Sequence, residues 1–345
     1  MSEVAPSSAR RPIRVAMVTA PAADTAIGMY AVRLTEALRK AGIDAVHLEH
    51  ANWSWRGIQP LFRALTRLSP DLVHYQFPMG AYGGGPTIQF AALLRPGVTT
   101  LHEASNYGPV RGRAKLLPFT LRSQAVIVTS ALERVYLVAS APWVRRRTVV
   151  IPIASNVPER PRHPSPARTV VYFGSIRPDK GIETFLETAA RWRRAGDATR
   201  FAVIGTPTPT QVAYAAGLRS AESAANVEWV SGLNDDDAAD LLADSGVAYL
   251  PFPDGLSARR GSFLAAAGCG LPVVTRPGRH TSPDLAAAAA MASTPDEADA
   301  AIKRLLADPA AALSLAEKAR AYAARFAWEA VAAEHARLYT RLLRR

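Results

Sequence analysis

Short apolar runs rich in β-branched residues recur along the chain, and each is followed by a turn and an Ala- and Leu-rich stretch. Nearly continuous apolar runs are typical of strands in a parallel sheet that is covered on both faces. In the first half the runs predict strands at Ile13–Thr19, Ala45–Leu48, Leu72–Tyr75, Val98–Leu101, Ala125–Thr129 and Thr148–Ile151. In the second half they predict strands at Thr169–Phe173, Arg200–Ile204, Val227–Val230, Val247–Leu250 and Pro272–Thr275.

Helical spacing fills the intervals between these runs. The pattern predicts helices at Met29–Ala41, Ile182–Arg194 and Asp235–Ala243, and a long pair from Pro309 to Arg345. Strands that alternate with helices in this way indicate βαβ units. The fold class is therefore α/β, with two Rossmann-like domains that we expect to face each other across a cleft.

A proline-rich segment separates the two halves. Five prolines occur between Pro152 and Pro166, and proline removes a backbone donor and biases the residue before it to extended geometry. We therefore expect a first domain over residues 1–155, a stiff linker over 156–167, and a second domain over 168–325.

Composition narrows the class of protein. The chain has 345 residues, of which 49% are apolar and 20% charged, so it can bury a substantial core. A single cysteine, Cys269, excludes an internal disulfide framework and a cysteine-based zinc site. No apolar run approaches the ~20 residues of a membrane-spanning helix, and the N-terminal stretch lacks a secretory apolar core. We expect a cytoplasmic protein.

The formal charge of +12 is concentrated in the first half. Residues 1–166 contain 20 Lys and Arg against 9 Asp and Glu, whereas residues 167–345 contain 21 against 20. Such an imbalance suggests an anionic partner, namely nucleic acid, membrane headgroups or a phosphorylated substrate. Solubility alone is the other explanation.

Ligands of open α/β sheets bind outside the carboxyl ends of the strands, so the turns after the strands carry the candidate chemistry. In the first half, Gly28 stands at a helix entry, where backbone amides can face an anion. The chain has no G-x-G-x-x-G, so a dinucleotide cofactor is not supported. His102 and Glu103 directly follow the fourth strand, and a histidine there can bond a substrate or exchange a proton. Gln76 and Tyr82 are candidate contacts for an acceptor.

The second half offers an anion site. Arg177 and Lys180 lie between the strand that ends at Gly174 and the helix that follows Gly181, so two cations and a helix N-terminus converge on one place. This arrangement predicts a diphosphate site. A later loop adds candidate contacts to phosphate or sugar hydroxyls at the start of a small-residue helix, namely Asp254, Arg259, Arg260, Gly261 and Ser262.

Taken together, these stretches resemble the family 4 nucleotide-sugar glycosyltransferases, which have the GT-B fold. The matching segments are the Gly28 loop, PDLVH, LHE and IPIASNVP in the first half, and FGSIRPDKG, the Ile204–Gly205 pair, NVEWVSGL and GLPVVT in the second. They span nearly the whole chain in the right order. The resemblance implies that Arg177 and Lys180 bind the donor diphosphate, that His102 contacts the transferred sugar, and that Gly232 and Leu233 lie near the base. It also implies that a C-terminal helix, residues 326–345, crosses back to the first domain.

The sequence departs from the family pattern at two places. Of two glutamates usually spaced seven apart, the second position holds Ala265, and Asp254–Gly255 resembles a displaced version of the first. The arginine that usually follows the strand-end glycine is Ser175, and Arg177 can supply that charge from two positions further on.

We therefore expect a retaining, metal-independent glycosyltransferase without a cofactor, whose co-substrate is a UDP-, GDP- or dTDP-linked sugar. Its acceptor would be a hydroxyl of a glycan, a lipid-linked glycan or a small molecule, and the basic first domain would touch the inner face of an anionic membrane. A GT-B sugar-nucleotide epimerase or hydrolase, a non-catalytic partner subunit and a nucleic-acid-binding protein remain as alternatives. The last lacks a recognisable module, so we expect no nucleic-acid partner.

Overall fold

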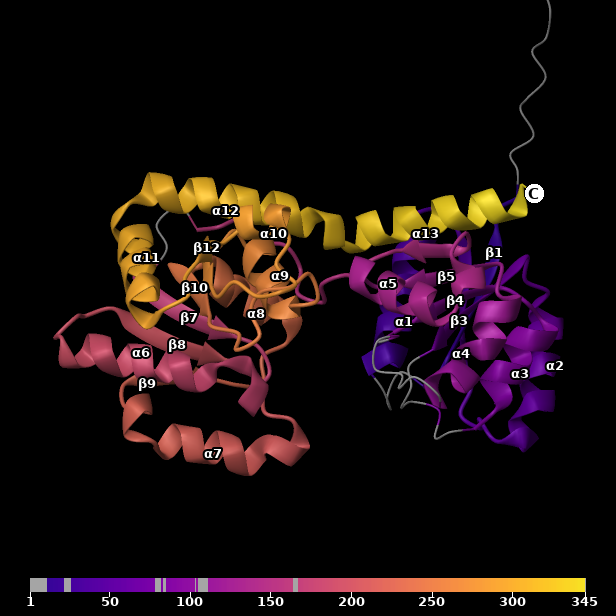
Figure 1. Ribbon diagram of the computed structural model, residues 1–345, viewed down its shortest axis with the longest axis horizontal. Coiled ribbons are helices and arrows are strands. Elements are labelled where there is room, and N and C mark those ends of the chain that lie inside the picture. The colour runs from indigo at the N-terminus through magenta and orange to yellow at the C-terminus, as the bar shows by residue number, and fades with distance from the viewer. Residues whose placement is uncertain are drawn as a thin grey trace, which may run out of the picture. The chain divides into compact units, whose positions relative to one another are not determined.

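The computed structural model describes residues 11–21, 26–77, 82, 85–102, 104, 111–163 and 167–344, with only the backbone given at 26 and 111–113. The chain divides into two compact units (Figure 1). The first unit combines Met1–Ile153 with Trp328–Arg345, and the second comprises Ala154–Ala327. The first unit is therefore discontinuous in sequence.

A parallel six-stranded sheet forms the centre of the first unit, in the order β2-β1-β3-β4-β5-β6. Every residue of β3, β4 and β5 is buried, as nearly continuous apolar runs predict. Its strands are β1 (Arg14–Thr19), β2 (Asp44–Glu49), β3 (Leu72–Phe77), β4 (Val98–Leu101), β5 (Ala125–Val128) and β6 (Thr148–Val150).

Helices connect these strands in turn. They are α1 (Ala26–Lys40), α2 (Ile58–Leu68), α3 (Thr87–Leu94), α4 (Arg111–Arg122) and α5 (Ala131–Ser140), with short 3-10 turns η1 (Trp55–Gly57) and η3 (Pro142–Val144). Leu61 and Leu65 of α2 are fully buried, while Arg63 and Arg67 are exposed. The apolar face of α2 therefore packs on its own unit and its arginines face solvent.

The last helix of the chain, α13 (Trp328–Leu343), packs against α1 in the first unit. Figure 1 shows it in yellow beside the strands of that unit, far from them in sequence. Its buried residues include Val331, Ala332 and Leu338, which is why the helix remains attached. The expected return of the C-terminal helix to the first domain is confirmed.

The second unit contains another parallel six-stranded sheet, in the order β12-β11-β10-β7-β8-β9. Its strands are β7 (Thr169–Phe173), β8 (Arg200–Ile204), β9 (Val227–Val230), β10 (Val247–Leu250), β11 (Val273–Thr275) and β12 (Ala290–Met291). Its helices are α6 (Ile182–Arg194), α7 (Val212–Ser220), α8 (Asp235–Ala243), α9 (Gly261–Gly268), α10 (Pro283–Ala287), α11 (Pro295–Ala307) and α12 (Pro309–Ala323), with 3-10 turns η4 (Pro178–Lys180), η5 (Pro209–Gln211), η6 (Glu222–Ala224) and η7 (Ala324–Phe326).

The proline-rich segment forms no helix or strand over residues 152–163, as its proline content predicts. It nevertheless packs on the second unit. The Arg160 guanidinium pairs with Asp236 and Asp240 of α8, and Arg162 donates to the Gly246 carbonyl at 2.8 Å. These contacts fix the entry of the chain into the second sheet.

Candidate functional site

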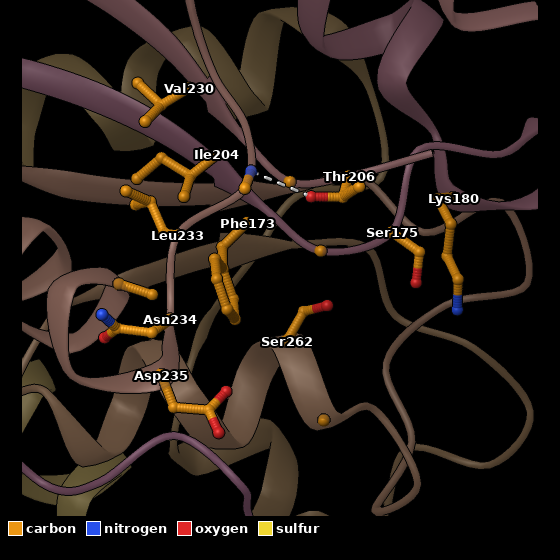
Figure 2. A pocket seen from close by; sticks show the side chains of 15 residues that line it. Phe173, Ser175, Lys180, Ile204, Thr206, Val230, Leu233, Asn234, Asp235 and Ser262 are labelled. Carbon is orange, nitrogen blue, oxygen red and sulfur yellow. Dashed lines mark hydrogen bonds between the residues drawn. The ribbon is translucent and has the colours of Figure 1, made fainter. Parts of the chain in front are cut away.

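A cavity in the second unit opens at the carboxyl ends of three neighbouring strands, β7, β8 and β9, and at the starts of α8 and α9 (Figure 2). Its volume is about 420 Å³. This is the edge at which open α/β sheets bind ligands. It is lined by Phe173, Gly174, Ser175, Lys180, Ile204, Gly205, Thr206, Val230, Gly232, Leu233, Asn234, Asp235, Ala238, Gly261 and Ser262.

Two glycines allow the backbone to form the floor of this cavity. Gly174 ends β7 with φ +143°, and a Cβ there would lie 2.5 Å from the Ser262 Oγ. A Cβ at Gly205, which follows β8, would overlap the Gly174 carbonyl. Both positions therefore require glycine, and the start of α9 approaches the strand ends closely.

Lys180 forms one end of the cavity, together with Ser175 and Ser262 (Figure 2). It closes the short turn η4 before Gly181, whose φ of +78° is the left-handed conformation that glycine accepts. A Cβ at Gly181 would overlap the Pro251 carbonyl, so this turn is packed against the strand end of β10. The position of Lys180 is thus held by the backbone on both sides.

Burial, together with the nearby Arg260 and Arg177 guanidinium groups, lowers the pKa of Lys180 to about 8, although Asp179 opposes the shift. Like charges that gather in a partly buried place disfavour one another's charged forms. An anion placed among them removes that penalty. The electrostatics of this end of the cavity therefore favour an anionic ligand.

The opposite end of the cavity is apolar. Figure 2 shows Ile204, Val230 and Leu233 grouped together, away from Lys180, with Phe173 between the two ends. The Gly232 amide donates to the Thr206 Oγ1 at 3.2 Å, which joins the segment after β9 to the segment after β8. One cavity thus offers an apolar wall and a cationic end, which suits a ligand with a flat ring system and phosphate groups.

Of the residues expected from the sequence to bind the donor, five line this cavity: Lys180, Gly232, Leu233, Gly261 and Ser262. Arg177 does not line it, and its guanidinium is paired with Asp179 at 2.7 Å and 3.0 Å. Arg260 directly precedes α9, pairs with the exposed Asp254 and stacks on the Phe252 ring at 4.4 Å. Arg259 is exposed and lies outside the lining.

The cavity also contains residues that the sequence reasoning missed, namely Thr206, Asn234 and Asp235. Thr206 comes two residues after the end of β8, so the rule that strand ends carry the site could have found it. Asn234 caps α8 by accepting a bond from the Asp237 amide at 2.8 Å. In a sequence, an asparagine directly before a helix indicates an N-cap and gives no sign of a ligand site.

The expected residues of the first half lie in the first unit. His102 follows β4 and is buried, with its Nε2 at 2.8 Å from the Gln76 Oε1. Gln76 is fully buried on β3, and the buried Tyr82 hydroxyl donates to its backbone carbonyl. Gln76 and Tyr82 could contact an acceptor, as expected from the sequence, only if their side chains became accessible. Gly28 is buried in the first turn of α1, and Glu103 lies outside the described residues.

Over the described ranges, no group of three or more His, Cys, Asp or Glu side chains could hold a metal ion. None of the helices in that part of the chain is long and apolar enough to cross a bilayer.

The fold is shared with known glycosyltransferases. Sucrose-phosphate synthase from Thermosynechococcus elongatus is 19% identical with a TM-score of 0.67, covering 96% of this chain and 99% of that one. Anabaena HepE in complex with UDP and glucose is 15% identical with a TM-score of 0.68, covering 95% and 99%. A glycosyltransferase from Rickettsia africae is 11% identical with a TM-score of 0.70, covering 96% and 99%. At these identities the likeness shows the fold, and the fold is GT-B.

A family model matches most of the second unit. Residues 167–308, which contain the cavity, match the model of the group 1 glycosyl transferases. A comparison with curated proteins finds no match. The match covers residues of the second unit, and it agrees with the resemblance to the family 4 glycosyltransferases that the sequence carries.

Proposed function

We propose that the cavity of the second unit binds the nucleoside diphosphate part of the donor, with the diphosphate against Lys180 and the start of α9. The observation that carries the proposal is the partly buried Lys180 ammonium, whose pKa is lowered by burial and by two neighbouring arginines. Ser175 and Ser262 offer hydroxyl groups beside it, and Gly261 and Ser262, the first residues of α9, line the same cavity.

The apolar end of the cavity would hold the nucleoside. Ile204, Val230 and Leu233 form a wall for a base, which would leave the amides and hydroxyls of the Gly232 and Thr206 turns to read its polar edge. HepE was solved in complex with UDP and glucose, and the pneumococcal O-GlcNAc transferase GtfA with UDP and GlcNAc. These complexes support a uridine donor as the first to test, followed by GDP and dTDP donors.

The proposed reaction transfers the sugar to an acceptor hydroxyl with retention. Positive charge develops on the sugar in the transition state and negative charge on the departing diphosphate. Lys180, with Arg177 once released from Asp179, would stabilise that leaving group without a metal ion. One preorganised donor of this kind contributes roughly 3–4 kcal/mol to the transition state. The departing phosphate would accept the proton of the acceptor hydroxyl.

We assign acceptor binding to the first domain, residues 1–155, and contact with the transferred sugar to His102. The His102 ring is uncharged near neutral pH, since burial, with a smaller effect of His335, lowers its pKa to about 4. Its Nδ1 has no hydrogen-bond partner among the described residues. A buried acceptor atom without a partner is costly unless a ligand supplies one.

The donor site is tested by Lys180→Ala. Loss of one charge-assisted contact should weaken UDP binding roughly tenfold or more, because such contacts contribute about 1.5–3 kcal/mol. The measurement is titration calorimetry with UDP-glucose and with GDP- and dTDP-sugars. Lys318→Ala, which removes an exposed lysine of α12, is the matched control. Unchanged binding in Lys180→Ala would place the diphosphate elsewhere.

A second proposed partner is an anionic membrane surface at the cytoplasmic face. Helices α2, α3 and α4 and the turn η3 pack side by side in the first unit, with η1 joining α2. They expose large apolar side chains at Trp55, Leu94, Leu117, Leu121 and Trp143. Exposed cations accompany them at Arg56, Arg63, Arg67, Lys115, Arg145 and Arg146. Apolar side chains interspersed with cations suit the interface of an anionic bilayer.

A further inference from the structure

A chain of buried polar side chains joins His102 to the C-terminal helix α13. It runs from Tyr339 on α13 through His74 and Gln76 on β3 to His102 after β4, and all four residues are at most 2% exposed. Buried polar groups of this kind are hydrogen-bonded to one another in defined directions.

The first link fixes the tautomer of His102. Its Nε2 lies 2.8 Å from the Gln76 Oε1, and an amide oxygen only accepts hydrogen bonds. The hydrogen of the neutral ring is therefore on Nε2, and Nδ1 keeps its lone pair. The rest of the ring faces the Tyr30 ring at 5.4 Å and the buried His335, so no charged side chain among the described residues competes for it.

The second link fixes the amide of Gln76. Its Nε2 lies 3.1 Å from the Met17 Sδ and 3.4 Å from the His74 Nε2. An amide N–H directed at these neighbours requires both to accept, and in that arrangement His74 carries no hydrogen on Nε2. The Thr100 Oγ1, at 2.7 Å, donates to the same nitrogen. If His74 Nε2 carried the hydrogen, it would oppose the amide N–H, and the Gln76 amide would turn over.

The third link fixes His74. Its pKa is lowered well below the usual value, first by burial and then by the nearby His335 and His102, so the ring is neutral. With Nε2 accepting, the hydrogen is on Nδ1, which lies 2.6 Å from the Tyr339 hydroxyl. In this direction the phenol oxygen accepts the bond, and its own hydrogen has no acceptor among the described residues. Burial raises the pKa of Tyr339, so it remains a neutral phenol.

We propose that Tyr339 and His74 are positioning residues, which orient the Gln76 amide and so hold His102 in the tautomer that presents a free Nδ1. Gln76 then serves the histidine rather than the acceptor. The use of Nδ1 to accept a hydrogen bond from a hydroxyl of the transferred sugar rests on the proposed function; the tautomer does not. A side chain 265 positions away from His74 in the sequence thereby sets the chemistry of the site.

Tyr339→Phe tests the whole chain of bonds. Without the phenol oxygen, the His74 Nδ1 hydrogen loses its acceptor, and the ring should prefer the tautomer that donates from Nε2 to Thr100. That hydrogen repels the Gln76 amide N–H, so the amide should turn over and donate to His102, whose hydrogen would move to Nδ1. Long-range ¹⁵N–¹H spectra of the histidine-labelled full chain report both tautomers, and His102→Ala assigns the signals among the seven histidines.

We expect wild-type His102 to be protonated on Nε2, and this state to be reversed or mixed in Tyr339→Phe. In the same variant kcat should fall roughly tenfold while the donor KM changes little, since a neutral hydrogen bond is involved. Tyr136→Phe, an exposed phenol of α5, is the matched control and should change neither. An unaltered His102 tautomer in Tyr339→Phe would overturn the inference. A reversed tautomer with wild-type kcat would keep the network and remove the proposed sugar contact.

Gln76→Glu provides a second variant should Tyr339→Phe not fold. A carboxylate facing the His102 Nε2 stabilises the imidazolium, so the pKa of His102 should rise from about 4. The NMR titration of His102 and the acid limb of the pH profile of kcat should then shift upward together. A pKa of His102 that stays at its wild-type value would show that Gln76 does not control the ring.

Discussion

The proposed diphosphate contact needs Lys180 to be positively charged, whereas burial and two neighbouring arginines disfavour its charged form. Its ordinary pKa is 10.5, and burial with the neighbouring Arg260 and Arg177 lowers this to about 8 in the free protein. A bound diphosphate stabilises the ammonium and raises the pKa again, so binding takes up a proton above pH 8. The affinity for UDP-glucose should therefore be constant below pH 8 and fall up to roughly tenfold for each pH unit above it.

Calorimetry at several pH values, in buffers of different ionisation enthalpy, measures both the affinity and the proton uptake. Lys180→Ala should bind UDP-glucose more weakly, and its affinity should no longer fall above pH 8. Any pH dependence that remains in this variant comes from other groups, such as the nucleotide base, and can be subtracted from that of the wild type. The same slope in wild type and variant would mean that another group binds the proton.

His102→Ala should lower kcat far more than it weakens nucleotide binding. The ring lies in the first unit and the proposed nucleotide cavity in the second, so we expect the variant to lose a contact to the transferred sugar and none to the nucleotide. One lost hydrogen bond lowers kcat by roughly tenfold to a hundredfold. Steady-state kinetics and calorimetry with UDP separate the two effects. An equal loss of UDP affinity would assign His102 to the base or phosphate site.

At the scale of single elements, the N-terminus of α8, which lies at the cavity, is stabilised by the side chain of Asn234. Asn234 accepts from the Asp237 amide and donates to the Asp237 carboxylate, both at 2.8 Å. Asn234→Ala should lower the stability of the second unit by about 1 kcal/mol, which corresponds to roughly 2–4 °C in its unfolding temperature. Asn234→Ser keeps a capping oxygen and should recover most of the loss. Scanning calorimetry with and without UDP measures the change.

The elements themselves could largely be predicted from the sequence. All eleven predicted strands form in the structure, within a residue or two of their expected ends, because buried parallel strands are short continuous apolar runs. β12 was missed, because Ala290 and Met291 follow a run of alanines that favours a helix. Only the pairing with β11 makes them a strand.

Cavity residues that lie in turns after strands could be predicted from the sequence. The partners of charged side chains could not. Lys180, Gly261 and Ser262 follow from the position of turns after strands. The pairing of Arg260 with Asp254, and of Arg177 with Asp179, depends on which partner each guanidinium reaches, and spacing does not decide that. The bond between Gln76 and His102 joins neighbouring strands, so it required the order of the sheet.

At the scale of the whole molecule, the positive charge of the first half should make the protein bind anionic membranes. Each lysine or arginine near an anionic surface contributes about 1 kcal/mol at moderate salt, so the cations of α2 and η3 would give reversible attachment. The chain should co-sediment with anionic vesicles at low salt, less so at high salt, and not with neutral vesicles.

Arg145→Gln combined with Arg146→Gln should weaken this binding, because both side chains are exposed beside Trp143. Arg304→Gln combined with Lys318→Gln, which removes two exposed cations of the second unit, is the matched control. Absence from both kinds of vesicle would leave an enzyme whose acceptor is not presented by a bilayer.

The discontinuity of the first unit has a consequence for biosynthesis. A ribosome makes the strands of the first sheet early, but it releases α13 only after the whole of the second unit, Ala154–Ala327, has been synthesised. Domains fold as units during synthesis, so the second unit can be complete while the first still lacks its last helix. Until then the His74 Nδ1 has no phenol to bond, and the pocket for α13 against α1 is open to water. The nascent chain can therefore form the cavity of the second unit before Tyr339 reaches His74.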